Sequence, residues 1–549
     1  MDDASLTDKS PAPGGFDEAA GAQMTLFAVI VSAFFFVRKF AGLIKEHLLA
    51  RFFGATGATD AFKLVYQGII FNLYTDAEQL LRPAYLPEFV HQRQEGEERA
   101  WRLTGTIATL EFVSLCVVAA GLMIFARPLI SALWPDLAAN PLSFQLAVLL
   151  LWIMAPALIL YSLSLMPELT LHAYKRFTLP AFAEAAYNIL VLIVLFAGVE
   201  FVWHPNNPHA ILAAGVGVLV GGASRLFIML PGLWSKLKML RPSLNLRGTP
   251  GATTVLALMP AVLMGLIISG ARPIVDGRVC TRLGEGMYTA LDYGRKLSDA
   301  GIMILPLAVS LVVFPYVSEW AAAGDRGRMT RALLWMTRAL AFLFVPLSVG
   351  MILLARPLCD IIYNYGQFKE ASLNQVTLAL MCYASGLFVY SVEGSINKWY
   401  FAMKDTWTPN WVGSLWAVGH LAISVVGGLY TPRGLAAVAL AYPISKSGKV
   451  LTLYLMLRPR LLPVPRREVW PFVVKLLLAS AVMGLVVWLV GVHVAPLARA
   501  HLHGKTRVLA LLLAGGLSGG VVFLALAALL QIEEVGMVWE WLKRKVRRR

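Results

Sequence analysis

Ionisable side chains inside long apolar stretches are the residues of this chain whose types and positions point most directly to chemistry. Placing such a group at the centre of a bilayer costs about 2.5 to 3.5 kcal/mol on insertion scales, so each one is a candidate for a binding or transport site. Lys39 and Lys45 lie six residues apart, about 120° from one another on a helix, and we expect both to border one cavity. The ionisable residues of the first two stretches are Arg38, Lys39, Lys45, Glu46, Arg51, Lys63, Asp76, Glu78 and Arg82.

A second set of charges follows in the other half of the chain. A helix expected at 286–320 contains Asp292, Arg295, Lys296 and Asp299 at helical spacing, and one expected at 371–400 adds Glu393 and Lys398. Cations that converge from both halves would suit a phosphate-bearing substrate, such as a pyrophosphate, because Lys and Arg donate charge-assisted hydrogen bonds to phosphate oxygens. The residues we predict to bind it are Lys39, Lys45, Arg82, Arg295 and Lys296, with Glu46, Asp60 and Asp299 as supporting acids.

Several of these charges also have purely structural interpretations. Arg51 and Lys63 lie beside the loop GATGATD, so their side chains are expected to extend to the membrane interface. Glu46 is open to two interpretations, since it either belongs to the site or only neutralises Lys45 or Lys39 in a structural pair.

The composition requires a lipid environment for most of the chain. Of the 549 residues, 58% are hydrophobic and only 15% are charged, so a soluble fold would expose large apolar patches. Apolar stretches of roughly 20 residues or more recur along nearly the whole sequence. We predict an all-α integral membrane protein of about fourteen transmembrane helices, near residues 24–50, 61–91, 103–133, 143–172, 180–203, 209–233, 253–277, 286–320, 330–356, 371–400, 408–430, 434–457, 468–493 and 506–531.

The distribution of positive charge predicts how these helices are oriented. The net charge of +16 comes from basic residues that gather in alternate loops, which membrane topology explains better than nucleic-acid binding. Both termini are then cytoplasmic, in agreement with an even number of helices. The N-terminal tail lacks the basic start of a secretory signal peptide, and we expect it to be disordered. The basic segments expected in the cytoplasm are Lys175 with Arg176, 236–247, Arg326 with Arg328, 458–467 and the terminal KRKVRRR.

The chain lacks the residue groupings typical of enzymes and cofactor-binding proteins. Its nine histidines show no metal-ligand spacing, and no Gly-rich phosphate loop follows a predicted strand. Without a convergent set of carboxylates or histidines, we expect no catalytic residue, metal or cofactor. The four cysteines are too scattered for a disulfide framework, although Cys280 and Cys359 both fall at predicted outer-face positions, which leaves one bridge between them open.

Three landmarks recur in the same order at nearly constant separation, which indicates an internal duplication. The pairs, which lie 228, 229 and 229 residues apart, are LPEFV at Leu86 with FPYVS at Phe314, ARPL at Ala126 with ARPL at Ala355, and Pro180 with Pro409. Because six helices separate equivalent points, the halves must have the same orientation, and we predict two parallel six-helix lobes around a central cavity. The predicted boundaries are a cytoplasmic tail at 1–23, lobes at 24–247 and 248–462, two additional helices within 463–535, and a basic tail at 536–549.

Several segments resemble one family of membrane transporters. KFAGLIKEHLLARFFGATGATDAF is similar to the family's opening pattern of two cations flanking a Gly, then an acidic residue, then a Gly-Ala loop ending in Thr-Asp-Ala-Phe. The later segments that match are AYKRFTLPAFAEAAYNI, DYGRKLSDAGIMILPLAVSLVVFPYVS, IIYNYGQF and YFAMKDTWTP. On these segments, which together span most of the chain, it resembles the MurJ (MviN) family of lipid II flippases, within the multidrug/oligosaccharidyl-lipid/polysaccharide exporter superfamily.

The resemblance implies a V-shaped, two-lobed bundle in the bacterial inner membrane. It also implies that the bundle moves lipid II, an undecaprenyl-pyrophosphate-linked peptidoglycan precursor, from the cytoplasmic to the outer leaflet. The family's essential cavity arginines correspond to Lys39, Lys45 and Lys296, or to Arg295 if the register slips by one residue. Membrane lipids and a lipid-linked sugar pyrophosphate are the implied partners, while cell-wall synthesis proteins are left open as further ones.

The chain departs from the family pattern at some positions. Asp60 matches the family's acidic residue at the start of the second predicted helix, 61–91. Leu73 stands where the family has an arginine in that helix, and Arg82 is an additional cation. Lysine is a compact point charge that cannot reproduce a bidentate guanidinium contact. These departures leave another polyprenyl-linked oligosaccharide, an O-antigen or exopolysaccharide unit, open as the substrate.

Three other classes of protein remain as alternatives. A multidrug antiporter shares the two-lobed plan, but it needs carboxylates or aromatic rings where this chain has lysines and arginines. A membrane-embedded glycosyltransferase would need large outer loops with catalytic acids, and the loops here are short. A divergent relative can also keep the fold as an inactive scaffold.

Overall fold

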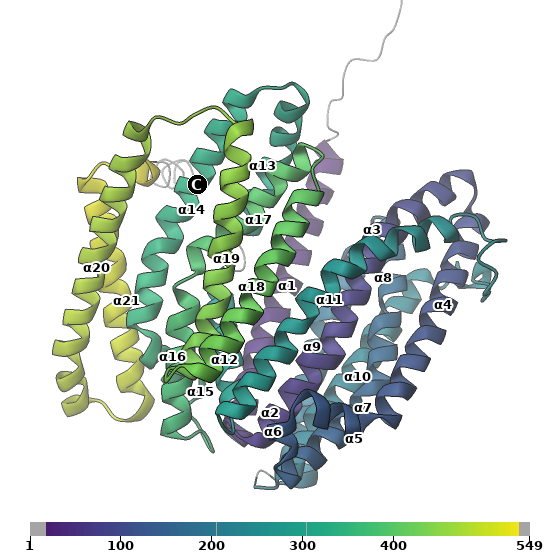
Figure 1. Ribbon diagram of the computed structural model, residues 1–549, viewed down its shortest axis with the longest axis horizontal. Helices are drawn as coiled ribbons and strands as arrows, with labels where there is room; N and C mark the ends of the chain where they lie inside the picture. Colours follow the sequence, from purple (N-terminus) through teal and green to yellow (C-terminus); the bar gives the residue numbers. More distant parts are fainter. Residues whose placement is uncertain (1–17, 205, 303–304, 537–549) are drawn as a thin grey trace, which may run out of the picture.

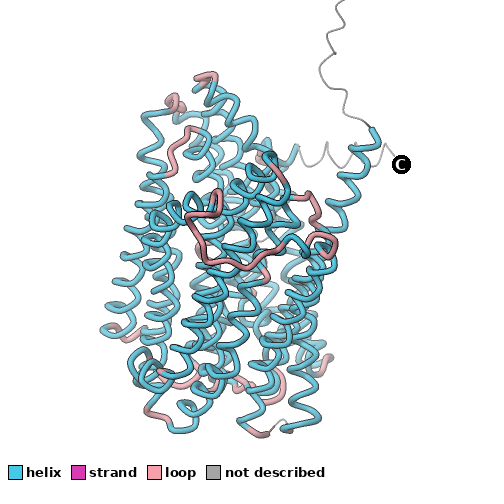
Figure 2. Tube along the Cα trace, turned by 90° about the vertical axis from the view of Figure 1, so that its right-hand side faces the viewer, coloured by secondary structure: helices cyan, strands magenta, loops and turns pink. Residues whose placement is uncertain are grey.

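The computed structural model describes residues 18–204, 206–302 and 305–536, and in this part of the chain all regular structure is helical (Figures 1 and 2). The helix α1 begins at Glu18 rather than near Met24. The remainder of the predicted N-terminal tail and nearly all of the basic C-terminal tail lie outside the described residues. The predicted fold class is confirmed.

The first half of the chain forms one group of helices. A π-helical turn, η1, interrupts the second span between α2 and α3. The elements are α1 (Glu18–Phe53), α2 (Gly57–Lys63), η1 (Leu64–Ile70), α3 (Phe71–Glu95), α4 (Glu97–Ile124), α5 (Ala126–Leu133), α6 (Pro135–Ala138), α7 (Pro141–Leu163), α8 (Leu165–Ala173), α9 (Thr178–Ala197), η2 (Gly198–Trp203), η3 (Pro208–Ile211), α10 (Leu212–Met229), η4 (Leu230–Leu233) and η5 (Leu237–Met239).

The second half repeats this plan and continues into two further helices. Its elements are α11 (Ala252–Leu283), α12 (Met287–Ile302), α13 (Leu305–Ala322), α14 (Arg326–Leu353), α15 (Ala355–Tyr363), α16 (Glu370–Ala384), α17 (Leu387–Ala402), α18 (Trp407–Tyr430), α19 (Gly434–Leu457), η6 (Arg458–Arg460), α20 (Arg466–His501) and α21 (Gly504–Leu529). The last two helices pack on each other and on α14 and α15, at the left edge of Figure 1. The domain boundaries themselves stay a prediction.

Within the described residues, eight helices are long and apolar enough to cross a membrane, or nine when the bent pair α16 and α17 counts as one span. The segments that complete the predicted fourteen are α1, α2 through α3, α11, α12 with α13, and α19. The first, second and fourth of these contain most of the charges that the sequence placed inside the membrane, and the others, Glu393 and Lys398, lie in α17.

The two lobes form a V (Figure 1). They meet at one end, where α2 contacts α12 and α1 contacts α15, and they diverge toward the other end. The start of α1 and the end of α21 both lie at the diverging end.

The landmarks of the duplication occupy equivalent places in the two halves. Each ARPL opens a short helix, α5 or α15, directly after a long one. Pro180 and Pro409 each lie in the first turn of α9 and α18. Proline is tolerated there because the first-turn N–H groups have no partner within the helix. The cysteine bridge left open by the sequence does not form, since Cys280 and Cys359 are both free and buried.

Candidate functional site

Five charged side chains meet where the lobes join, and we call them the central cluster. They are Lys45 and Glu46 of α1, Lys63 of α2, and Asp292 and Lys296 of α12. Glu46 lies 3.0 Å from the Lys63 ammonium and 3.6 Å from that of Lys45, and it also pairs with Lys296. Asp292 pairs with Lys63 and lies 3.1 Å from the Lys296 ammonium. Two of these ion pairs, Lys63 with Asp292 and Lys296 with Glu46, therefore join one lobe to the other.

The central cluster has more positive than negative charge. Lys63 is only 1% exposed, and Glu46 and Asp292 are also buried, whereas the side chain of Lys296 is 29% exposed. Two carboxylates face three ammonium groups, so one positive charge remains when all five are ionised. The Lys63 ammonium also lies 3.7 Å from the centre of the Tyr293 ring, whose face is electron-rich. A buried excess of this kind is suited to an anion.

The burial of Lys63 corrects the expectation that it extends to the membrane interface. It is enclosed by two carboxylates from different helices, and the Asp292 partner lies 229 residues further along the chain. Arg51, the other residue expected to do so, is exposed and lies over the ring of Phe52. Glu46 pairs with Lys45, as one interpretation held, but Lys63 and Lys296 are also its partners.

Next to this cluster, each lobe binds the first turn of a helix from the other lobe. Asp60 accepts hydrogen bonds from the backbone N–H groups of Gly286 and Thr289, at 2.7 and 2.8 Å, and from the Thr289 hydroxyl at 2.6 Å. In return, the Gly57 N–H donates to the Glu285 carboxylate at 2.6 Å. Helix starts have unpaired N–H groups and a partial positive charge, so a carboxylate stabilises each one. We call these contacts the outer latch.

The residues that meet here are equivalents in the duplication. Asp60 contacts Thr289 and Lys63 contacts Asp292, each 229 residues apart, and the Gly57–Glu285 bond spans 228 residues. In a pair of units related by a two-fold axis, a residue can touch its own equivalent only close to that axis. The axis that relates the lobes therefore runs between α2 and α12, through the central cluster.

Gly286 allows the lobes to approach this closely. Its φ of +80° is a conformation that side-chain-bearing residues rarely adopt. A Cβ atom at this position would also lie 2.2 Å from the carbonyl oxygen of Ala55 in the other lobe. The glycine is thus required both by its backbone conformation and by the contact between lobes.

Lys39 lies apart from the central cluster. It is about two turns closer to the start of α1, roughly 9 Å along the helix axis, and therefore nearer the diverging end. Its ammonium lies 5.6 Å from the Phe35 ring centre, and among the described residues it has no acidic partner within ion-pair distance. A half-buried cation without a partner is available to a ligand.

The N-terminal lobe holds a second charged group whose members neutralise one another. The buried Arg225 of α10 pairs with Glu168 at 2.5 Å and with Glu184 at 2.6 Å. Arg82 also pairs with Glu168, at 2.7 Å, as well as with Glu78. The structure thus places Arg82 in this neutralised group rather than beside Lys45 and Lys296.

The C-terminal lobe contributes further cations. Glu393 of α17 lies 2.6 Å from Lys446 and 2.7 Å from Lys449, both of α19. The side chains of Arg295 and Asp299 lie 3.7 Å apart and are nearly half exposed, with the Arg295 guanidinium 4.7 Å from the Tyr442 ring centre.

Sequence reasoning missed three of these cations, Arg225, Lys446 and Lys449. A signal for each was present, because all three lie inside apolar stretches of α10 and α19, where an ionisable residue is unusual. The role of every predicted binding residue stays a prediction.

The fold and the charged axis define a class of protein. Two duplicated helical lobes that meet at one end and diverge at the other form a multi-pass membrane transporter rather than an enzyme. The family model described as lipid II flippase MurJ matches residues 49–502, and the chain belongs to this family.

Individual relatives and structures agree with this assignment. The chain is 28% identical over 505 residues to a lipid II flippase MurJ of Burkholderia cenocepacia, covering 88% of this chain and 95% of that protein. It is 24% identical to a probable lipid II flippase MurJ of Vibrio cholerae, covering 86% and 90%. A solved lipid II flippase MurJ in an inward closed conformation shares the fold, with a TM-score of 0.74 at 20% identity over 91% of this chain and 99% of that one. An inward-facing multidrug transporter of the MATE family shares it less closely, with a TM-score of 0.64 at 12% identity over 77% and 94%.

Proposed function

We propose that this protein moves lipid II, the undecaprenyl-pyrophosphate-linked precursor of peptidoglycan, from the cytoplasmic to the outer leaflet of the bacterial inner membrane. Membership of the lipid II flippase MurJ family supports this function. The structural observation on which the proposal rests is the positive central cluster on the axis between the lobes. A pyrophosphate is the kind of anion that ammonium groups bind through charge-assisted hydrogen bonds.

We infer that the described conformation is inward-facing. The positive-inside pattern supports a cytoplasmic location for both termini, and the start of α1 and the end of α21 lie at the diverging end of the V. The outer latch then closes the opposite side, toward the outer leaflet. Lys39, nearer the open end, would meet the headgroup before the central cluster does.

Substrate binding would weaken the contacts that keep the outer side closed. Lys296 binds Glu46 across the lobe boundary, and Lys45 binds Glu46 within its own lobe. A pyrophosphate bound to these lysines competes with Glu46 for them, so the ion pair that joins α1 to α12 is lost. Once substrate contacts replace this ion pair, less free energy is needed to break the outer latch. The headgroup then crosses as the two lobes rock relative to each other.

The function can be tested by complementation. The resident lipid II flippase of a bacterial host is depleted, and growth is supported by wild type or by Lys39→Ala, Lys45→Ala or Lys296→Ala at matched membrane levels. The control is Arg102→Ala, because Arg102 is an exposed cation whose only described ion pair is a surface one with Glu98 at 3.7 Å. We expect wild type and Arg102→Ala to rescue growth, and the three lysine variants to fail or rescue poorly.

The substrate is the part of the proposal that this experiment can contradict. If well-expressed wild type does not rescue, another polyprenyl-linked oligosaccharide becomes the better candidate, since lysines stand where the family has arginines. If all variants rescue as well as wild type, the assignment of these lysines to the substrate site is wrong, even though the proposed function holds.

A further inference from the structure

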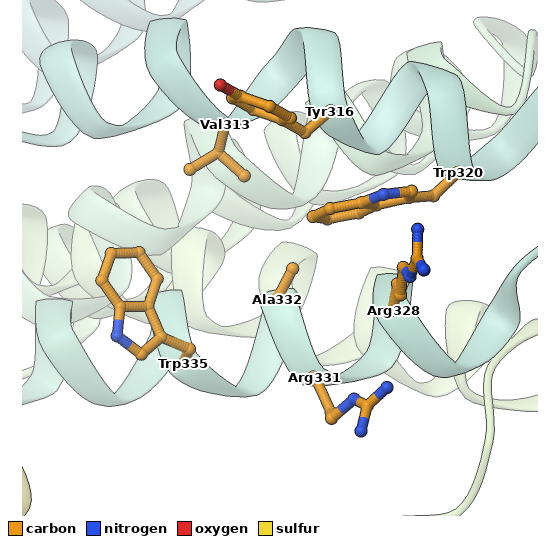
Figure 3. Close-up of a pocket in the computed structure, with 7 residues that line it drawn as sticks. All are labelled: Val313, Tyr316, Trp320, Arg328, Arg331, Ala332 and Trp335. Atoms are coloured by element: carbon orange, nitrogen blue, oxygen red, sulfur yellow. The ribbon is translucent and has the colours of Figure 1, made fainter.

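A groove opens on the surface of the C-terminal lobe, between α13 and α14 (Figure 3). Its volume is about 450 Å³, within the roughly 300 to 1,000 Å³ range of small-molecule sites. The side chains that line it are Val313, Tyr316 and Trp320 from α13, and Arg328, Arg331, Ala332 and Trp335 from α14. The buried faces of the same helices, with Val317 and Met336, point elsewhere into the core.

The lining changes from charged to apolar along the groove. The two helices form a hairpin whose loop lies between Ala322 and Arg326, so Trp320 and Arg328 are at the loop end. Val313 and Trp335 lie at the other end, as Figure 3 shows. From Arg328 to Trp335 the helix advances about 10 Å. Charged groups thus sit where the chain leaves the membrane, and apolar groups sit deeper in it.

The aromatic residues place this hairpin at a membrane surface. Tyr316 is 55% exposed and Trp335 is 46% exposed, and the Tyr316 ring lies 6.1 Å from that of Trp320. Trp and Tyr are enriched at the level of lipid headgroups, where one end of the ring is apolar and the other is hydrated. A ligand in this groove therefore spans the same boundary.

Neither guanidinium is held in a buried ion pair, and Figure 3 shows Arg328 pointing toward Trp320 across the groove, whereas Arg331 points to the other side of α14. Among the described residues Arg331 has no acidic partner within ion-pair distance, and Arg328 pairs with Asp325 at 3.2 Å on the exposed surface. Exposed pairs of this kind contribute little to stability, so a ligand phosphate can replace Asp325. Glu319 is exposed on the neighbouring helix but does not line the groove.

We propose that this groove is a binding site for one anionic phospholipid of the surrounding bilayer. Its phosphate is held by Arg328 and, once that side chain turns toward the groove, by Arg331, and one acyl chain lies along Tyr316, Val313 and Trp335. The site does not depend on lipid II transport, and only its assignment to the cytoplasmic leaflet rests on the proposed orientation. A bound lipid would restrain the hairpin of α13 and α14 in the C-terminal lobe.

The site can be tested on the purified full-length protein by native mass spectrometry. Delipidated protein is titrated with phosphatidylglycerol, or with phosphatidylcholine of the same chains, and the apparent Kd of the first bound lipid is measured. We expect wild type to prefer phosphatidylglycerol, and Arg331→Gln to bind it about tenfold more weakly, the usual effect of losing a charge-assisted hydrogen bond. Arg326→Gln is the matched control, because Arg326 is exposed in the same loop but does not line the groove.

A second variant tests the groove without changing its charge. Ala332→Phe places a ring inside the groove and should also weaken phosphatidylglycerol binding, while both arginines remain. The melting temperature of each variant is compared with wild type, so that a folding defect in one variant does not decide the outcome. The two variants perturb the same groove in different ways, since Arg331→Gln removes a charge and Ala332→Phe fills space.

Three results would overturn the proposal. If wild type binds phosphatidylcholine as tightly as phosphatidylglycerol, the groove does not recognise the lipid's charge. If Arg326→Gln and Arg331→Gln lose the same affinity, the effect comes from the general charge of the loop rather than from the groove. Displacement of phosphatidylglycerol by undecaprenyl pyrophosphate, abolished by Arg331→Gln, would reassign the groove to the transported lipid. Since lipid binding is measured without transport, the first two outcomes leave the proposed flippase activity unaffected, and the third would add the groove to its substrate path.

Discussion

Lys63 demonstrates how a residue's neighbours on the chain can mislead about its environment. Beside the polar loop GATGATD it looks like an interfacial lysine, but it is enclosed by Glu46 and Asp292. The sequence marked Asp292 as an unusual intramembrane charge without indicating which cation it would meet. Its partner lies 229 residues away and is defined only when the lobes assemble, so no local pattern contains this information.

We expect Lys63→Met to destabilise the folded protein strongly. It keeps the length of the side chain but leaves Glu46 and Asp292 with less compensation, and breaking a buried pair costs about 3 to 5 kcal/mol. Thermal unfolding in detergent should show a lower Tm, with partial recovery in Lys63→Met combined with Asp292→Asn. Lys238→Met, at an exposed lysine, is the control. An unchanged Tm in Lys63→Met would contradict the assignment of this pair.

Lys39 should respond in the opposite way. Because it has no described acidic partner, Lys39→Ala should change the free energy of unfolding by no more than about 0.5 kcal/mol, as at other sites without a specific interaction. Growth in the complementation assay should nevertheless fall, and Lys39→Arg should restore it. A large loss of Tm in Lys39→Ala would mean that the residue is structural rather than a ligand for the substrate.

At the scale of the helices, hydrophobic pattern predicts the spans but not their breaks. All fourteen predicted stretches correspond to helical segments within the described residues, because a run of apolar residues in a bilayer has little alternative to a helix. The π-helical turn η1 and the separation of α5 from α4 were not predicted. Both depend on which hydrogen-bond partners the backbone N–H and C=O groups find in the folded structure, and the apolar pattern does not encode these partners.

The outer latch predicts an effect on conformation. Asp60→Asn removes a full negative charge from the start of α12, an interaction worth about 1 kcal/mol, so the outward-open state should become roughly fivefold more populated. Cys280 is fully buried near Asp60 and can report this opening. A charged, membrane-impermeant thiol reagent added outside should label it faster in Asp60→Asn than in wild type.

Two controls make the labelling experiment specific. Cys280→Ser should abolish the difference, because the other cysteines then supply only background. Asp136→Asn removes a charge from the exposed start of the short helix α6, which makes none of the latch contacts, and should leave the rate unchanged. Equal labelling of wild type and Asp60→Asn would show that this carboxylate does not hold the outer side closed.

At the scale of the whole molecule, the two helices outside the duplication, α20 and α21, pack on α14 and α15 of the C-terminal lobe. Arg338 of α14 binds Glu534 at 2.7 Å and Glu533 at 3.0 Å, and its guanidinium lies 4.7 Å from the Phe472 ring centre. Lys505 at the start of α21 binds Asp360 of α15 at 2.7 Å. The pair α20–α21 should therefore move with the C-terminal lobe as a unit.

Loss of the Arg338 contact should loosen this attachment. Arg338→Met leaves the buried Glu534 unpaired, which costs about 1 to 3 kcal/mol. Limited proteolysis should cut the loop between η6 and α20 faster, and the Tm should fall. Arg467→Met, at an exposed arginine in the first turn of α20, should change neither. Proteolysis at the wild-type rate in Arg338→Met would show that other contacts hold the two helices.

The contact between Lys63 and Asp292 has a consequence for assembly. Because these residues are equivalents on the axis, a pair of identical N-terminal halves would set one lysine against another, and a pair of identical C-terminal halves would set one aspartate against another. Both pairings bury like charges, which repel in a medium of low dielectric. Only unlike halves attract, so the divergence of one position after duplication gives the chain a means of excluding self-paired halves.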